Sequence, residues 1–242
     1  SNWTIAHDRL ANTNHLCGYF DTEEQGRESY RELREAFSVL PEQPEVKELD
    51  DQEWQNAYKA YIDPWASRDL HWVPVWMREE YDVPADHTAI YLDAGMAFGT
   101  GSHETTRLMA RRLLDYRDAV GAATFAEKAI VDAGCGSGIL AISAARLGAN
   151  HVYGFDRDPE AVKVSCENLE FNGLPAAAIE FLEAGIEEGL RGRHVDLMVA
   201  NIQADVLQIY AEQLVASIQP GGVLAMSGIL AVELDKVLAR FN

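Results

Sequence analysis

From residue 129 onward, short apolar runs alternate with amphipathic segments of helical period. The predicted strands are 129–133, 151–156, 179–183, 195–200 and 222–227. The predicted helices are 138–147, 158–171 and 204–218. Strands that alternate with helices form parallel βαβ units. Runs such as Ala129-Ile130-Val131 are apolar throughout, as in strands that are buried on both faces. We therefore predict an α/β fold with a doubly wound, mostly parallel sheet and a ligand site at its carboxyl edge.

The N-terminal region has a different pattern. Residues 15–20 favour a short strand, and residues 22–38 carry apolar side chains at helical spacing. Asp50 and Glu53 form a capping-box pattern that predicts a helix reaching nearly to Pro64. We predict three parts: a small α/β unit at 1–47, a connecting helix and linker at 48–87, and a ligand-binding domain at 88–242.

The composition limits the class of protein and its partners. The chain has 242 residues and a formal net charge of −19, so it repels phosphate backbones and favours a basic partner. A charge of this sign also simply keeps a surface soluble. The apolar runs are too short to span a bilayer. The cysteines, Cys17, Cys135 and Cys166, form no CxxC pair, so we expect a reducing cytoplasm and neither a disulfide framework nor a bound metal.

The most informative motif follows the strand predicted at 129–133. Asp132 ends that strand, and Gly134, Gly136 and Gly138 then alternate with small residues before a helix. Glycine permits positive φ and lets a ligand approach the backbone closely. The spacing is GxGxG, because Ile139 occupies the place of the third glycine in the dinucleotide pattern GxGxxG. The motif therefore disfavours a nicotinamide dinucleotide, and it lacks the Lys of a phosphate-binding P-loop.

Two polar residues lie at the ends of predicted strands. Asp156 lies twenty residues after Gly136, where a carboxylate can accept both ribose hydroxyls of an adenosine. The alternative for Asp156 is a helix cap, although Asp158 before Pro159 fits that role better. Asn201 can offer its carbonyl oxygen to an amine or its NH₂ group to a cofactor, or it can cap the following helix.

A second unusual stretch runs from residue 93 to residue 106. Glycines, Phe98 and hydroxyl residues precede an amphipathic helix there. Such a loop can close over a ligand, or it can serve only as an elaborate start to the helix. His103 fits a structural hydrogen-bonding role better than a catalytic one.

These motifs together resemble the ribosomal protein L11 methyltransferases, which are class I S-adenosylmethionine-dependent enzymes with a Rossmann-like fold. The resemblance spans roughly residues 48–235, and the matching segments are 95–106, 132–142, 154–159, 199–202 and 220–230. Val73-Pro74-Val75-Trp76 also resembles the Pro-x-Trp of that family. Ala94 stands where the family has Pro, and a leading strand of the N-terminal unit is not evident. The family's last pair of strands would follow Asn242, so we expect either a smaller sheet or a chain that continues.

The resemblance implies a function and a set of site residues. Thr106, Gly134, Asp156 and Asn201 would contact S-adenosylmethionine, together with the motif residues Asp132, Gly136 and Gly138. Asn201 would hold a neutral amine and Phe98 would exclude water, with no dedicated general base assigned. The substrate would be a basic large-subunit ribosomal protein. The methyl groups would go to its lysine side chains, to its N-terminal α-amine or to both. The enzyme would be a monomer that binds no nucleic acid or membrane. The alternatives are methylation of a non-ribosomal protein and a non-catalytic binding module built on the cofactor fold.

Overall fold

The computed structural model describes residues 3–8, 13–20, 22–37, 39–46, 59, 62–93 and 103–241. The chain divides into two compact units, Ser1–Ala57 (unit 1) and Tyr58–Asn242 (unit 2). The connecting helix predicted from residue 48 falls mostly on residues outside the described ranges. None of the described helices is long and apolar enough to cross a membrane.

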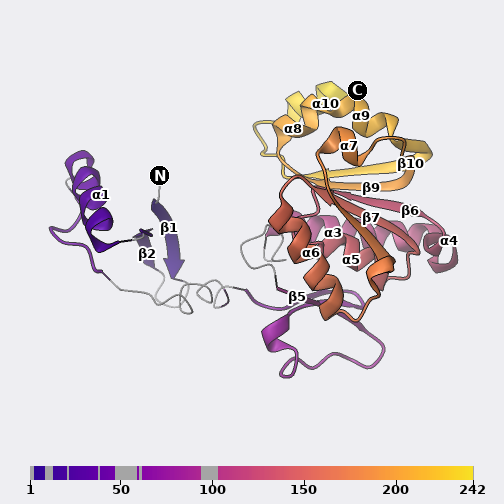
Figure 1. The fold of residues 1–242 in the computed structure, drawn as a ribbon, viewed down its shortest axis with the longest axis horizontal. Helices are drawn as coiled ribbons and strands as arrows, with labels where there is room; N and C mark the ends of the chain where they lie inside the picture. The colour runs from indigo at the N-terminus through magenta and orange to yellow at the C-terminus, as the bar shows by residue number, and fades with distance from the viewer. Residues whose placement is uncertain are drawn as a thin grey trace. The chain divides into compact units, whose positions relative to one another are not determined.

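The described part of unit 1 contains two strands and a helix. Strands β1 (Trp3–Asp8) and β2 (Thr13–Gly18) pair antiparallel, and helix α1 (Glu23–Ala36) follows them (Figure 1). Thr22 caps α1, because its side chain accepts a hydrogen bond from the Gln25 amide at 3.3 Å. β2 and α1 agree with the predicted strand and helix, whereas β1 was not predicted.

The main sheet of unit 2 has five parallel strands in the order β10-β9-β6-β7-β8. Their bounds are β6 (Ala129–Ala133), β7 (His151–Asp156), β8 (Ile179–Glu183), β9 (Val195–Asn201) and β10 (Ile218–Ser227). The strand order reverses at β6, because β7 lies on one side of it and β9 on the other. Ligands of open parallel sheets bind at the carboxyl ends of the strands beside such a reversal.

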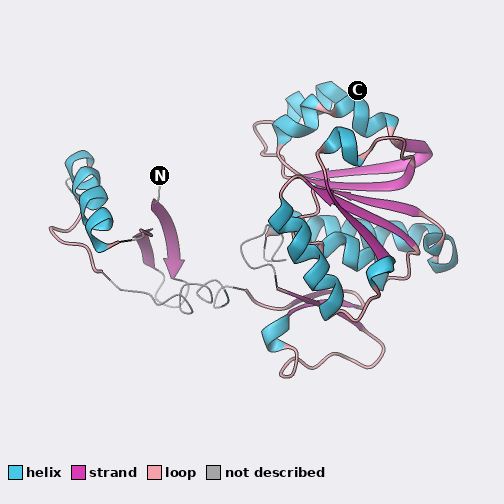
Figure 2. Ribbon diagram, in the orientation of Figure 1, coloured by secondary structure: helices cyan, strands magenta, loops and turns pink. Residues whose placement is uncertain are grey.

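Helices cover both faces of this sheet (Figures 1 and 2), which confirms the predicted doubly wound α/β fold. The helices of unit 2 are α3 (Glu104–Val120), α4 (Ala122–Ala126), α5 (Ile139–Arg146), α6 (Pro159–Phe171), α7 (Ile186–Gly189), α8 (Ala204–Ile209), α9 (Ala211–Ala216) and α10 (Leu234–Phe241). Ile130 and Leu197 pack in the core with α3, α5 and α6. Their neighbours Val131 and Met198 pack in a second core with α7, α8 and α9. Burial on both faces explains why these strands are continuously apolar.

A second, three-stranded sheet packs on the side of α3, α5 and α6. It consists of β3 (Trp65–Ser67), β4 (Leu70–Pro74) and β5 (Thr88–Leu92), with β3 antiparallel and β5 parallel to β4. A short 3₁₀ turn, η2 (Val75–Met77), follows β4, and a second, η3 (Ala176–Ala178), precedes β8. Trp72 of β4 donates its indole N–H to Ser143 Oγ of α5 at 2.9 Å. Leu70 and Trp72, which lie in the segment expected to be a linker, therefore belong to the hydrophobic core of unit 2.

Two predicted elements differ in detail from the structure. The single helix predicted at 204–218 is two helices, α8 and α9, because Tyr210 leaves the helical conformation with φ −102° and ψ 17°. β10 begins at Ile218, four residues earlier than predicted, and its pairing with β9 shifts register between Ile218 and Val223.

Candidate functional site

The glycine turn connects the end of β6 to the start of α5 at the carboxyl edge of the main sheet. Gly134, Gly136 and Gly138 have φ values of 74°, 54° and 76°. A side chain at Gly134 would also clash with Cγ2 of Ile202, which follows β9. The amides of Gly134 and Cys135 both donate to the carbonyl oxygen of Phe155 in β7, each at 2.9 Å. The turn is therefore fixed by positive φ angles and by its two neighbouring strands, as the spacing of the glycines predicts.

Asp132 lies beneath this turn. Its side chain is 1% exposed, and its Oδ2 accepts a hydrogen bond from the Ala141 amide of α5 at 3.1 Å. Burial raises the pKa of Asp132 to about 7, and the nearby charge of Asp156 acts in the same direction. The structure therefore places Asp132 where it connects β6 to the first turn of α5 and supports the glycine turn from below.

Asp156 ends β7 and faces the turn. Its Oδ2 accepts from the Gly136 amide at 2.9 Å, and its Oδ1 accepts from the Asp158 amide at 3.0 Å. Asp158 is the residue that caps α6, because its carboxylate accepts from the Glu160 amide at 3.0 Å. Since a carboxylate has about four lone-pair positions, Asp156 keeps the capacity to accept further hydrogen bonds.

Asn201 and Thr106 meet beside the turn. Asn201 ends β9, and its Nδ2 lies 3.4 Å from Oγ1 of Thr106, which is 1% exposed in the first turn of α3. Asn201 Oδ1 is buried and has no hydrogen-bond partner among the residues that the structure describes. A buried carbonyl oxygen without a partner is costly, so this atom points to a ligand that donates a hydrogen bond. His103 caps α3 by accepting from the Thr105 amide at 3.3 Å, in agreement with the structural role expected for it.

The sequence analysis missed two residues of α6 that hold the turn from the side. Ser165 Oγ donates to the Gly136 carbonyl at 2.8 Å, and Asn168 Nδ2 donates to the Ser137 carbonyl at 2.9 Å. Both side chains are 0% exposed. Their spacing of three residues among apolar neighbours on one helix face is the signal that could have identified them.

Phe98 and the segment from residue 94 to residue 102 lie outside the described residues. Of the predicted site residues, the structure brings together Thr106, Asp132, Gly134, Gly136, Gly138, Asp156 and Asn201 around the carboxyl ends of β6, β7 and β9.

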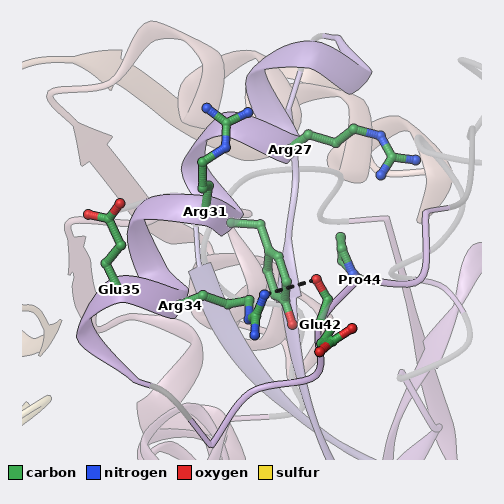
Figure 3. Close-up of a pocket in the computed structure, with 7 residues that line it drawn as sticks. Arg27, Arg31, Arg34, Glu35, Glu42 and Pro44 are labelled. Carbon is green, nitrogen blue, oxygen red and sulfur yellow. Dashed lines mark hydrogen bonds between the residues drawn. The ribbon is translucent and has the colours of Figure 1, made fainter.

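Unit 1 has a pocket of about 410 Å³ on one side of α1 (Figure 3). Its lining residues are Arg27, Tyr30, Arg31, Arg34, Glu35, Glu42 and Pro44. Arg34 donates to the Glu42 carbonyl oxygen at 3.2 Å, and Arg27 pairs with Glu23 at 2.6 Å. The pocket is therefore lined by side chains of both signs of charge, three arginines and two glutamates.

Curated relatives match most of the chain. The protein named ribosomal protein L11 methyltransferase from Dechloromonas aromatica (strain RCB) is 43% identical over 197 residues, which is 81% of this chain and 61% of the relative. A protein of the same name from Clostridium botulinum (strain Eklund 17B / Type B) is 37% identical over 199 residues, 82% of this chain and 60% of the relative. The aligned part of the chain thus spans about three fifths of the length of these relatives.

A solved structure and a family model agree with these relatives. The crystal structure of ribosomal protein L11 methylase from Lactobacillus delbrueckii subsp. bulgaricus is 34% identical, with a TM-score of 0.61 over 72% of this chain and 83% of that one. The family model described as Ribosomal protein L11 methyltransferase (PrmA) matches residues 3–242. The chain belongs to the ribosomal protein L11 methyltransferase (PrmA) family.

Proposed function

We propose that the protein is an S-adenosylmethionine-dependent protein N-methyltransferase. Its proposed substrate is a basic large-subunit ribosomal protein, and the names of the relatives point to L11. The proposed acceptors are amines, either lysine side chains, the N-terminal α-amine or both. Family membership and the geometry at the carboxyl edge of the main sheet support this proposal.

The residues at this edge fit S-adenosylmethionine. The glycine turn has positive φ angles at Gly134, Gly136 and Gly138, a backbone conformation that suits the close approach of a ligand. Asp156 is fixed against the turn by the Gly136 amide and can accept two ribose hydroxyls through its remaining lone pairs. Thr106 would contact the cofactor from the first turn of α3, while Asp132 would keep the turn in place from below. Gly136 and Gly138 complete the turn.

The observation that carries the proposal is the buried Oδ1 of Asn201, which has no hydrogen-bond partner within the described part of the chain. The Nδ2 of this side chain faces Thr106, so Oδ1 remains to accept a hydrogen bond from an amine N–H. Such a bond would orient the nitrogen lone pair of a neutral amine for in-line attack. When bound, S-adenosylmethionine supplies an electrophilic methyl group on its sulfonium sulfur. Asn201 would then act by positioning the nucleophile.

Three further parts of the proposal rest on sequence. Phe98 would exclude water from the reacting atoms. Residues 1–47 would recruit the protein substrate. The net charge of −19 suits a basic protein and disfavours nucleic acid, and we propose a monomer that acts in the cytoplasm.

Mass spectrometry of purified ribosomal protein L11, after incubation with this protein and isotope-labelled S-adenosylmethionine, tests the proposal. We expect labelled methyl groups on lysine side chains or on the N-terminal α-amine. Asn201→Leu has a similar volume but no acceptor, so it should lower turnover at least about tenfold while the protein remains folded. Absence of label on L11 with the wild-type protein would contradict the proposed substrate, and normal turnover of Asn201→Leu would contradict the proposed role of Asn201.

A further inference from the structure

Two buried asparagines belong to α6 and its end: Asn168 lies in the helix and Asn172 is its C-cap, and they are 0% and 8% exposed. Burying an amide is costly unless each of its polar groups finds a hydrogen-bond partner. In both residues the side-chain oxygen accepts and the side-chain nitrogen donates a hydrogen bond. They differ in what they connect.

Among the described residues, the side chain of Asn172 forms hydrogen bonds with the second sheet and with α6. Its Oδ1 accepts from the Tyr91 amide at 2.9 Å, and its Nδ2 donates to the Tyr91 carbonyl and to the Asn168 carbonyl, both at 2.7 Å. β5 is an edge strand, so Asn172 satisfies the backbone groups that a further strand would otherwise pair. This arrangement accounts for Asn172 as a packing residue.

Asn168 joins two different parts of the fold. Its Oδ1 accepts from the Asp93 amide, directly after β5, at 2.8 Å. Its Nδ2 donates to the Ser137 carbonyl of the glycine turn at 2.9 Å. One buried side chain therefore connects the end of the second sheet to the turn that would hold the cofactor.

The bond to Ser137 controls the direction of a peptide group inside the turn. The carbonyl of Ser137 and the amide of Gly138 belong to one planar peptide, and that amide donates to the Cys135 carbonyl at 2.8 Å. Glycine at 136 and 138 leaves the backbone with unusual freedom on both sides of Ser137. An external hydrogen bond at this carbonyl selects one of the conformations that the glycines allow.

We propose that Asn168 is a positioning residue for the cofactor, because it links the glycine turn to the end of β5 and holds the turn in its binding conformation. The identity of the ligand in this inference rests on the proposed function. Asn168 does not need to touch the ligand, since it acts through the Ser137–Gly138 peptide.

A matched pair of substitutions separates positioning from packing. Calorimetry should show that Asn168→Ala weakens binding of S-adenosylhomocysteine about tenfold. Asn172→Ala removes three hydrogen bonds rather than two, yet it should weaken binding less than about threefold, because Asn172 does not contact the turn. Equal losses in the two variants, or an unchanged affinity in Asn168→Ala, would overturn the inference.

A second measurement needs no ligand. Hydrogen exchange at the Gly138 amide of the unliganded protein should be faster in Asn168→Ala than in the wild type, and unchanged in Asn172→Ala. If the wild-type protein fails to bind S-adenosylhomocysteine, the proposed function is contradicted, and the exchange at Gly138 still decides whether Asn168 orders the turn.

The wild-type protein provides a test that does not depend on whether Asn168→Ala folds. The side-chain amide resonances of Asn168 should shift in NMR spectra when S-adenosylhomocysteine is added, whereas those of Asn172 should not. Resonances of Asn168 that stay unmoved on saturation with this ligand would assign both asparagines to packing.

Discussion

At the scale of single residues, two aspartates near the end of β7 show how the structure separates roles that the sequence leaves open. Both Asp156 and Asp158 precede a helix, so either could cap it. Asp158 accepts from the Glu160 amide and caps α6, while Asp156 turns toward Gly136. The sequence predicted Asp156, Asn201 and the glycines because strand ends and glycine spacing are local features. It did not predict Ser165 or Asn168, because their bonds to the turn depend on how α6 packs.

Replacing each aspartate with alanine should therefore have different effects. Asp156→Ala should weaken binding of S-adenosylhomocysteine at least about tenfold, because hydrogen bonds to a charged acceptor contribute about 1.5–3 kcal/mol each. Asp158→Ala should leave that affinity nearly unchanged and lower the free energy of unfolding by about 1 kcal/mol through loss of the cap. Calorimetry and urea unfolding measure the two quantities. An unaltered affinity in folded Asp156→Ala would remove Asp156 from the proposed site.

Asp132 should make stability depend on pH. Its folded-state pKa of about 7 lies above the unfolded value, so the buried site favours the protonated carboxyl. The stability that Asp132 contributes is therefore fully present below about pH 4 and is lost as the pH rises through about 7. Asp132→Asn keeps an oxygen acceptor for the Ala141 amide but does not titrate. Between about pH 5 and about pH 8, the free energy of unfolding of the wild type should therefore fall by about 2 kcal/mol relative to this variant. Parallel urea titrations that show no such change would mean that Asp132 is ionised in the folded protein.

At the scale of secondary-structure elements, β6 and β9 were predicted to within a residue, because their largely apolar runs are buried on both faces. β7 and β8 have the predicted bounds as well, although β8 is mostly exposed. The second sheet was not predicted. β3 and β4 are short and flank a tight turn in which Arg68 has a φ of 56°, and β4 ends in Pro74. The break between α8 and α9 at Tyr210 has no Pro or Gly to indicate it. These features arise from tertiary packing rather than from local sequence.

Trp72 should be the main anchor of the second sheet. It is 2% exposed, stacks on Trp65 with a centroid distance of 3.8 Å, and donates to Ser143 Oγ. Trp72→Phe loses the indole N–H and part of the ring, so the free energy of unfolding should fall by about 2 kcal/mol. Trp76→Phe makes the same change at a less buried position and should cost less than about 1 kcal/mol. Equal losses in chemical unfolding would show that the Trp72–Ser143 bond contributes little.

At the scale of the whole molecule, binding of the cofactor and binding of the protein substrate should be separable. All described residues of the candidate site lie in unit 2, whereas unit 1 forms its own hairpin and helix. The distribution of motifs along the sequence predicts a division of function between the two units, and the recruiting role of the N-terminal unit remains a proposal.

A chain that begins at Tyr58 should keep an affinity for S-adenosylhomocysteine within about threefold of the full chain, because the site residues are intact. Methylation of ribosomal protein L11 by this shortened chain should be lost. Calorimetry and labelled methyl transfer measure the two properties on the same preparation. Normal turnover on intact L11 would show that residues 1–57 do not recruit the substrate.

The central claim is that the glycine turn, Asp156 and Asn201 form a site for S-adenosylmethionine. Calorimetric titration of the unliganded protein with S-adenosylhomocysteine and, separately, with NAD tests it most directly. The account predicts one site per chain for S-adenosylhomocysteine and no measurable heat of binding for NAD, because GxGxG replaces the dinucleotide spacing. Binding of NAD without binding of S-adenosylhomocysteine would contradict the account.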